Sequence, residues 1–338
     1  MNPRILLVTP DSYPGSLAAC YYRAFSRRGL EAHLHLLFGG NRNNLLLRAI
    51  SRFGLSRQAL LRKEAETLGR VVEHFQPDLI LFTNFNEEVL LKRFKEQNSA
   101  LLFCLYSDGP LVAPGLHHSS FGLATQHYDC IFTFARTHLP IFYLSGARRV
   151  EVLPLAHDPE IHHPVALSDG EYHYYESPVG YVGTYQLEFY EYWFKALVPF
   201  GLKIWGNQWN HLPLSSPLRG CWKGYAPSLA KVCGGSSIMF NFIRADHGCA
   251  HSMKTFEIPA CRGFVITNRT DEQLEFFEED ECAVYFSTVE ELIDKVKFYL
   301  ERRALRLKIL EAAWKRVQEY TYLHRIEKIL EVYQELRD

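Results

Sequence analysis

Short apolar runs alternate with helical stretches along most of this 338-residue chain. Continuous apolar runs bounded by turn residues are typical of parallel strands that are buried on both faces. In the first half these runs occupy Ile5–Thr9, Ala32–Phe38, Leu79–Thr83, Leu101–Tyr106, Ile131–Phe134 and Val150–Leu153. Because helical stretches separate several of them, the pattern predicts βαβ units and a parallel sheet.

The pattern stops between Pro154 and Pro178, where His, Asp, Pro and Tyr gather, and then restarts. The second set of predicted strands is Val179–Thr184, Leu202–Trp205, Ser237–Asn241, Phe264–Thr267 and Ala283–Phe286. We therefore predict an α/β fold of two tandem doubly wound (Rossmann-like) domains. The predicted parts are a first domain at 1–155, a linker at 156–177, a second domain at 178–320 and a closing C-terminal helix at 321–338. Ligands of such folds lie at the carboxyl ends of strands, which for two domains predicts the cleft between them.

Composition excludes several classes of protein. The formal net charge is −1, so no global basic field points to nucleic acid. Eight cysteines without a Cys-x-x-Cys pair indicate reduced thiols and not a disulfide framework. The first apolar run is too short for a signal peptide, and no segment approaches the ~20 apolar residues of a membrane span. We expect a cytoplasmic protein with no nucleic-acid partner.

The segment 241–267 carries most of the chemistry. It leaves a predicted strand, passes Arg244 and Lys254, and enters a short predicted helix that holds Glu257. A strand, a polar loop and a helix N-terminus with two cations nearby suit a phosphate-bearing ligand. The alternative is that Arg244 and Lys254 form surface ion pairs with Asp246 or Glu257.

Further candidates follow other predicted strands. Gly183 and Gly206 permit tight turns or close approach of a ligand, and Gly15 can approach phosphates after the first strand. Trp205 is interpreted either as a base-stacking ring or as a core aromatic. Asp108 is the best candidate for a base or an oxocarbenium stabiliser, with a turn-forming Asp before Gly-Pro as the alternative. No Gly-x-Gly-x-x-Gly follows the first strand, so no dinucleotide cofactor is predicted.

Two other features remain. His247 and His251 flank Cys249 at a spacing that suits a metal, but no second ligand cluster completes such a site, so no metal is predicted. Residues 41–63 contain six basic side chains and no acid, interleaved with Leu and Ile. This pattern predicts basic amphipathic helices, which suit either an anionic membrane or lipid-linked acceptor, or a solvated face over the core.

The stretch Ser252-Met253-Lys254-Thr255-Phe256-Glu257, continuing to Gly263, resembles the donor-site segment of the group 1 glycosyltransferases of GT-B fold, in particular their CgeB-like branch. That branch usually reads Ser-Met-Arg-x-Phe-Glu-x-x-Ala-Cys-Gly-Gly. Other pieces agree in order and spacing over roughly residues 178–330. They are Tyr181-Val182-Gly183-Thr184, Ile204-Trp205-Gly206 followed by Trp209, Asn241 with Arg244, and Tyr320-Thr321-Tyr322 with Arg325.

The resemblance implies a GT-B architecture with the acceptor side in the first domain and a nucleotide-sugar donor bound by the second. It implies metal-independent sugar transfer to a glycan, lipid-linked or protein acceptor. Arg244 and Lys254 would hold the diphosphate, Glu257 would accept hydrogen bonds from a ribose or sugar hydroxyl, and Asp108, Lys254 and Glu257 would be the catalytic residues. The implied donor contacts are Gly15, Gly183, Thr184, Trp205, Gly206, Asn241, Arg244, Ser252, Lys254, Thr255, Phe256 and Glu257.

The chain departs from the family pattern at three positions, one of which is Lys254, where Arg is usual; lysine keeps the charge but loses the bidentate fork. Arg262 stands where Gly is usual, and Cys249 stands where many group 1 enzymes carry a second Glu, eight residues before Glu257. Two alternatives stay open, and the departures at Cys249 and Arg262 favour the second of them. One is a nucleotide-sugar epimerase or hydrolase of the same fold, and the other is a catalytically inactive GT-B scaffold or binding protein.

Overall fold

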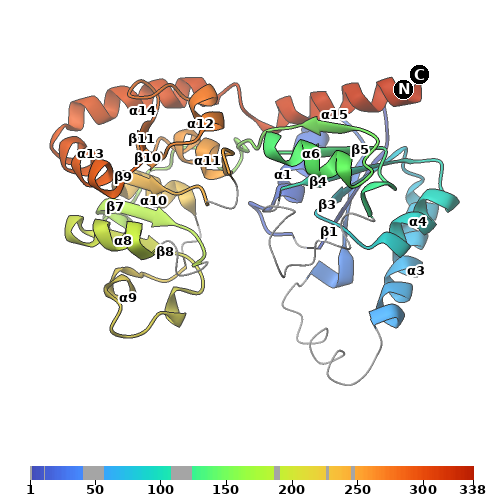
Figure 1. The fold of residues 1–338 in the computed structure, drawn as a ribbon, viewed down its shortest axis with the longest axis horizontal. Coiled ribbons are helices and arrows are strands. Elements are labelled where there is room, and N and C mark those ends of the chain that lie inside the picture. Colours follow the sequence, from blue (N-terminus) through green and yellow to red (C-terminus); the bar gives the residue numbers. More distant parts are fainter. Residues whose placement is uncertain are drawn as a thin grey trace. The chain divides into compact units, whose positions relative to one another are not determined.

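The computed structural model describes residues 2–10, 12–40, 57–107, 124–185, 191–225, 228–244 and 248–338. The chain divides into two compact units (Figure 1). The first unit comprises residues 1–154 and 322–338, and the second comprises residues 155–321. Each unit is built on one parallel sheet, which confirms the predicted α/β fold of two tandem Rossmann-like units.

The first unit contains a six-stranded sheet in the order β2-β1-β3-β4-β5-β6. Three of its strands, β1, β3 and β4, have the predicted bounds, because each is an unbroken apolar run between turn residues. The strands are β1 (Ile5–Thr9), β2 (Ala32–Leu36), β3 (Leu79–Thr83), β4 (Leu101–Tyr106), β5 (Cys130–Thr133) and β6 (Val150–Val152). The α-helices are α1 (Leu17–Arg27), α3 (Arg57–Phe75), α4 (Glu88–Gln97), α6 (Leu139–Leu144) and α15 (Tyr322–Arg337).

One face of this sheet forms a core with α3, α4 and α6. Alternate strand residues such as Leu6, Ile80 and Leu102 are fully buried there against Leu68 of α3 and Leu91 of α4. Alternate side chains of a strand point to opposite faces, so a strand that is buried throughout needs cover on both sides. Helix α1 packs against β1 and β2, and α15 packs against α1.

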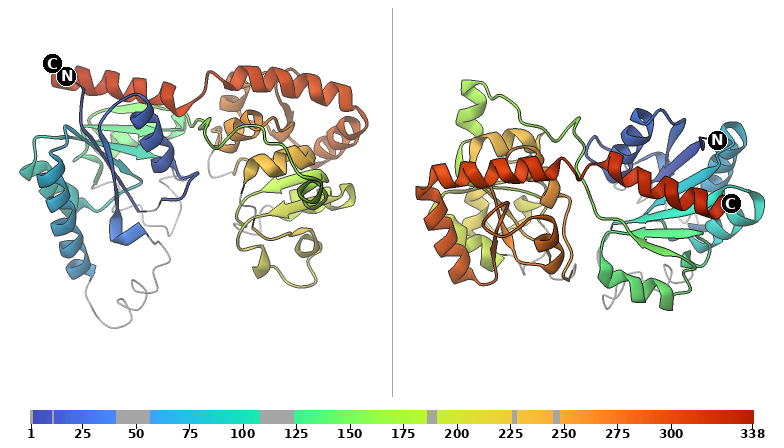
Figure 2. Two further views of the ribbon diagram at one scale, coloured as in Figure 1. Left: turned by 180° about the vertical axis from the view of Figure 1, so that it is seen from behind. Right: turned by 90° about the horizontal axis from the view of Figure 1, so that it is seen from above.

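The helix α15 is last in the chain and belongs to the first unit (Figure 2). The ring of Tyr322 meets that of Tyr21 edge-on, with 5.0 Å between the ring centres. Further along the helix, Arg28 pairs with Glu327 at 2.6 Å. Burial raises the pKa of the Tyr21 hydroxyl, although Arg325 opposes that shift. Aromatic packing and ion pairing therefore hold the end of the chain on the first unit.

The second unit contains a five-stranded sheet in the order β11-β10-β9-β7-β8. The strands are β7 (Ser177–Val182), β8 (Leu202–Trp205), β9 (Ser236–Asn241), β10 (Val265–Asn268) and β11 (Val284–Phe286). The α-helices are α7 (Asp169–Tyr175), α8 (Glu191–Leu197), α9 (Pro217–Cys221), α10 (Leu229–Gly235), α11 (Lys254–Ala260), α12 (Asp271–Phe276), α13 (Val289–Glu301) and α14 (Arg303–Val317). Short 3-10 helices occur at Leu37–Gly40 and Arg136–His138 in the first unit, and at Val198–Phe200 and Trp209–His211 in the second.

The two sheets share one strand order. In each of them the first strand lies between the second and the third, so the chain reverses its direction of winding between β1 and β3 and again between β7 and β9. Open α/β sheets bind ligands at such switch points, outside the carboxyl ends of the strands. The strand order therefore marks the ends of β7 and β9 as a position for a ligand.

The segment between Pro154 and Pro178 contains a helix that the sequence analysis did not predict. Residues 155–177 belong to the second unit, and α7 lies within them. Ser168 accepts the amide N–H of Glu171, whose carboxylate accepts the amide N–H of Ser168. This reciprocal cap satisfies amides at the start of the helix, and the Ser-x-x-Glu spacing was the available signal.

None of the helices in the described part of the chain is long and apolar enough to cross a membrane.

Candidate functional site

A cavity of about 240 Å³ lies at the carboxyl ends of β7 and β9, the switch point of the second unit. Part of its wall is aromatic and part is polar, with two cationic side chains. The lining residues are Tyr181, Gly183, Thr184, Phe194, Asn241, Phe242, Ile243, Arg244, Ser252 and Lys254. Six of the predicted donor contacts therefore meet in one cavity, namely Gly183, Thr184, Asn241, Arg244, Ser252 and Lys254.

Close packing of two glycines shapes the end of β7. A Cβ atom on Gly206 would lie 2.0 Å from the carbonyl oxygen of Gly183, and Gly206 has a φ of 146° that side chains rarely adopt. Gly183 donates its amide N–H to Trp205 at 2.9 Å and accepts the indole N–H of Trp209 at 2.7 Å. Gly206 thus supports the cavity wall from behind, while Gly183 forms part of that wall.

The side chain of Asn268 holds the loop after β9 at Ile243, the residue before Arg244. The amide oxygen of Asn268 accepts the Ile243 N–H at 2.6 Å, and its amide nitrogen donates to the Ile243 carbonyl at 2.9 Å. A side chain that bonds both backbone groups of one residue determines the path of the chain at that residue. Asn268 therefore directs where the chain places Arg244.

Lys254 begins α11 on the other side of the cavity. Among the residues that the structure describes, no carboxylate forms an ion pair with it, so the predicted alternative of a pair with Glu257 is absent from that part of the chain. The neighbouring Ser252 hydroxyl is buried and has no hydrogen-bond partner in the described ranges. A buried hydroxyl without a partner costs free energy, so this atom favours a ligand that bonds to it.

Glu257 does not line the cavity. Its side chain is nine-tenths buried, and its carboxylate faces the imidazole of His162, with 3.4 Å between Oε1 and Nε2. His162 Nδ1 accepts the Asp158 N–H at 3.1 Å, which leaves the proton on Nε2, toward Glu257. His162 is not among the predicted site residues, because nothing in its local sequence points to a partner 95 positions away.

Two thiols lie near this carboxylate. Cys233 and Cys261 are buried, and burial raises the pKa of the Cys233 thiol, with further contributions from Cys261 and Glu257. A raised pKa keeps the thiol protonated, and the thiolate is the reactive form of cysteine. Burial and the raised pKa favour a packing role for Cys233.

His251 is bonded on both ring nitrogens. Its Nε2 accepts the Leu155 N–H at 3.0 Å, and its Nδ1 faces Glu272 at 2.8 Å, with His251 fully buried. The contact joins the start of the second unit to α12. Since both nitrogens have protein partners, His251 is a structural histidine; His247 lies outside the described residues.

The remaining predicted donor contacts lie away from the cavity. Trp205 ends the edge strand β8 and is fully buried beside the ring of Tyr175, with 5.8 Å between the ring centres. Phe256 is fully buried among His251, Phe276 and Tyr320. These two rings serve the core, and the interpretation of Trp205 as a base-stacking ring has no support in this geometry.

Three other predictions concern the first unit. Gly15 belongs to it and precedes Ser16, which caps α1 by accepting the Ala19 N–H. Asp108, the candidate base, lies outside the described residues. Of the basic stretch 41–63, residues 41–56 also lie outside them, and 57–63 form the start of α3.

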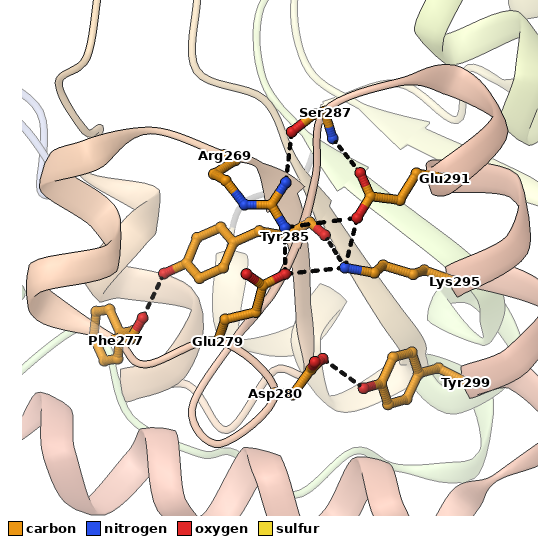
Figure 3. Close-up of polar contacts among 9 residues, drawn as sticks. All are labelled: Arg269, Phe277, Glu279, Asp280, Tyr285, Ser287, Glu291, Lys295 and Tyr299. Carbon is orange, nitrogen blue, oxygen red and sulfur yellow. Dashed lines mark hydrogen bonds and ion pairs between the residues drawn. The ribbon is translucent and has the colours of Figure 1, made fainter.

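Four charged side chains of the second unit form a lattice of ion pairs (Figure 3). Arg269 and Lys295 both pair with Glu279, and both also pair with Glu291, at 3.6 and 2.9 Å. Glu291 accepts the Ser287 N–H and not, as a complete capping box would require, the N–H of Thr288. The lattice joins the loop after α12, the end of β10 and helix α13.

Comparisons with known proteins agree with this geometry. The family model described as Glycosyl transferase-like matches residues 188–331. A glycosyltransferase from Rickettsia africae has 12% identity and a TM-score of 0.70, with 100% of each chain covered. Anabaena HepE, in a complex with UDP-glucose, has 13% identity and a TM-score of 0.70, with 99% of this chain and 100% of that chain covered. Sucrose-phosphate synthase from Thermosynechococcus elongatus has 11% identity and a TM-score of 0.73, with 98% and 99% covered.

No curated protein sequence matches the chain. At identities of 11–13% the structural likeness establishes the fold, which is the GT-B-like fold of glycosyltransferases. Residues 188–331, most of which belong to the second unit, are similar in sequence to the glycosyl transferase-like family. The predicted resemblance is confirmed to that extent.

Proposed function

We propose that this protein is a glycosyltransferase of the CgeB-like branch that transfers a sugar from a nucleoside diphosphate sugar to an acceptor hydroxyl. The observation that carries the proposal is the cavity in the glycosyl transferase-like unit, where Arg244, Lys254 and the unpaired Ser252 hydroxyl converge. Two cations and a hydroxyl suit a diphosphate. The UDP-glucose in the structure of Anabaena HepE supports this class of donor for a protein of the same fold.

The chemistry follows from the charges. As the bond from the anomeric carbon to the phosphate oxygen breaks, negative charge develops on the leaving diphosphate. Arg244 and Lys254 offset that charge, so the proposed reaction has no requirement for a metal ion. The acceptor oxygen forms the new bond to the anomeric carbon, and its proton passes to a base, for which Asp108 remains our candidate.

Glu257 has a proposed role through its burial. The buried carboxylate of Glu257 faces His162 at 3.4 Å, which is longer than most N–H···O hydrogen bonds, so its oxygens can accept hydrogen bonds from a ligand. Hydroxyl groups of the donor's ribose or sugar would supply them. Residues 41–63 are proposed, from their sequence pattern alone, to contact an anionic membrane or a lipid-linked acceptor.

The decisive experiment is a thermal-shift screen of nucleoside diphosphates against the wild type, Lys254→Ala and Arg244→Ala. A bound nucleotide should raise the melting temperature of the wild type and raise that of each variant less. Lys328→Ala is the matched control, because Lys328 is a surface lysine of α15 whose removal leaves the cavity unchanged.

If no nucleotide stabilises the wild type, the transferase proposal loses its basis. If Lys254→Ala responds as fully as Lys328→Ala, the diphosphate role of Lys254 is wrong. Turnover of the nucleotide sugar without any acceptor would identify the epimerase or hydrolase alternative, and binding without turnover would identify the scaffold. Activity that survives chelation with EDTA would support metal-independent transfer.

A further inference from the structure

A single buried amide connects three parts of the cavity wall. Gln273, in the first turn of α12, is 1% exposed and is the centre of a polar network behind the cavity. Its Oε1 accepts the hydroxyls of Thr255 at 3.2 Å and Thr267 at 3.3 Å. Its Nε2 donates to the Asn268 carbonyl at 2.8 Å and to the Thr270 hydroxyl at 3.1 Å.

The four partners fix the orientation of the amide. A carbonyl oxygen such as that of Asn268 can only accept, so the nitrogen of Gln273 must face it and the oxygen must face the two threonine hydroxyls. All four hydrogen-bonding positions of the side chain are then occupied. A fully satisfied buried amide is rigid, since each alternative rotamer leaves buried groups without partners.

Each partner leads to a residue at the cavity. The Thr267 hydroxyl also accepts a hydrogen bond from the side-chain Nδ2 of Asn241, which lines the cavity, at 3.4 Å. Thr255 follows Lys254 directly and accepts the Ser252 N–H at 3.2 Å. Asn268 bonds both backbone groups of Ile243, the residue before Arg244.

We infer that Gln273 is a positioning residue that sets the separation of Arg244 and Lys254 and thereby the preference of the site for a diphosphate. The inference rests on the proposed function, because it takes the two cations as diphosphate ligands. Gln273 itself does not line the cavity, so its effect passes through Thr255, Thr267 and Asn268. Supporting groups behind binding residues commonly have this effect on affinity.

The helix that carries Gln273 is itself held in place. Tyr285 donates its hydroxyl to the carbonyl of Gln273 at 3.0 Å. It also donates to the carbonyl of Phe277 at 2.8 Å, the contact that Figure 3 shows. The Gln273 amide N–H also lies 3.4 Å from the Thr270 hydroxyl that caps α12. The side chain therefore projects from a fixed backbone, which a positioning residue requires.

The test compares UDP with UMP as probes, in titrations of the wild type and of Gln273→Met. Methionine has nearly the same length but forms none of the four bonds. The affinity for UDP should fall about tenfold, while the affinity for UMP should change by less than about threefold. The reason is that a diphosphate contacts both cations and depends on their separation, whereas a single phosphate does not. An equal loss for both nucleotides would overturn the inference, since a purely structural role would weaken them alike.

Backbone hydrogen exchange gives a readout that needs no nucleotide. In Gln273→Met, the amides of Ile243 and Ser252 should exchange about fivefold faster or more, because their partners lose support. Gln273→Glu keeps the oxygen that accepts the threonine hydroxyls but loses the donor to Asn268. In that variant the Ile243 amide should exchange faster and the Ser252 amide should not.

Leu292→Ala is the matched control, because Leu292 is a fully buried core residue of α13 with no part in the network. It should lower the melting temperature while the ratio of UDP to UMP affinity stays constant. Failure of UDP to bind the wild type would contradict the proposed function, and the role of Gln273 would then be judged by hydrogen exchange. Unchanged exchange at Ile243 and Ser252 would overturn the role of Gln273 whether or not a nucleotide binds.

Discussion

The guanidinium of Arg262 lies over the ring of Trp314, with 4.3 Å from its central carbon to the ring centre. The same guanidinium pairs with Glu311 at 3.1 Å, so Arg262 links the end of α11 to α14. Its φ of 55° lies in the left-handed region that glycine favours, which explains why Gly is usual at this position in the resembled family. Contacts with α14, and not an approach to the donor, account for the arginine.

These contacts predict that Arg262→Ala lowers the free energy of unfolding more than Arg262→Gly does. Alanine loses the contacts and keeps the positive φ, for a cost of about 1 kcal/mol. Glycine loses the same contacts but relieves the backbone strain, so its stability should lie within about 0.5 kcal/mol of the wild type. All five tryptophans lie in the second unit, so urea unfolding followed by tryptophan fluorescence reports on that unit. Equal destabilisation by both variants would contradict this account of Arg262.

Gly206→Ala should destabilise the second unit by about 3 kcal/mol or more, or prevent folding. Its Cβ would lie 2.0 Å from the Gly183 carbonyl oxygen, which is backbone and cannot move aside. Gly220→Ala is the control, because no atom lies within 4 Å of its Cβ position and the residue is in α9. Helical Gly→Ala should leave stability equal or raise it by about 0.5 kcal/mol. The measurements are the soluble yield and the melting temperature of the two variants, and equal values for both would contradict the prediction.

The charged lattice of Figure 3 predicts a specific dependence of stability on pH. Burial alone would raise the pKa of the Glu279 carboxyl, but hydrogen bonds from Arg269 and Lys295 hold it below its usual 4.5. A pKa that is lower in the folded state favours folding above the unfolded pKa, and this contribution is lost as the pH falls through the folded pKa. Glu279→Gln should therefore cost about 1 kcal/mol at neutral pH and progressively less below pH ~4.5.

The measurement is the urea midpoint of wild type and Glu279→Gln at about pH 7 and about pH 3. Glu301→Gln is the control, since Glu301 is an exposed carboxylate at the end of α13, outside the lattice. A gap between wild type and Glu279→Gln that is the same at both pH values would show that the lattice does not contribute through this carboxylate.

The pair of Glu257 and His162 predicts a preference for ribonucleotides. If Glu257 accepts hydrogen bonds from ribose, Glu257→Gln should weaken UDP binding about tenfold, and His162→Leu should weaken it in the same direction. Neither variant should change the binding of 2′,3′-dideoxy-UDP by more than about twofold, because that analogue lacks both hydroxyls. Calorimetric titration with the two nucleotides is the measurement, and equal losses for both would remove Glu257 from the ribose site.

Local patterns predicted the strands, and together with the family resemblance they named six of the ten residues that line the cavity. Ile5–Thr9, Leu79–Thr83, Leu101–Tyr106 and Leu202–Trp205 have the expected bounds, because apolar runs of strand length fold the same way in most surroundings. Strand ends of a parallel sheet share one edge, so Gly183 and Arg244 could be grouped without coordinates, and the family resemblance added Asn241. Helix α7 was missed although Ser168 and Glu171 form its cap, because apolar periodicity was absent there.

The sequence by itself determined two parallel α/β sheets and a cluster of cations after the strands of the second one, since hydrophobic periodicity and turn chemistry are properties of neighbouring residues. Only the tertiary structure decided which polar groups meet. It joined His162 to Glu257 and Leu155 to His251, placed Gln273 among Thr255, Thr267 and Asn268, and returned α15 to the first unit. Buried polar groups must find partners wherever the chain brings them, and those partners lie at sequence separations that no local pattern records.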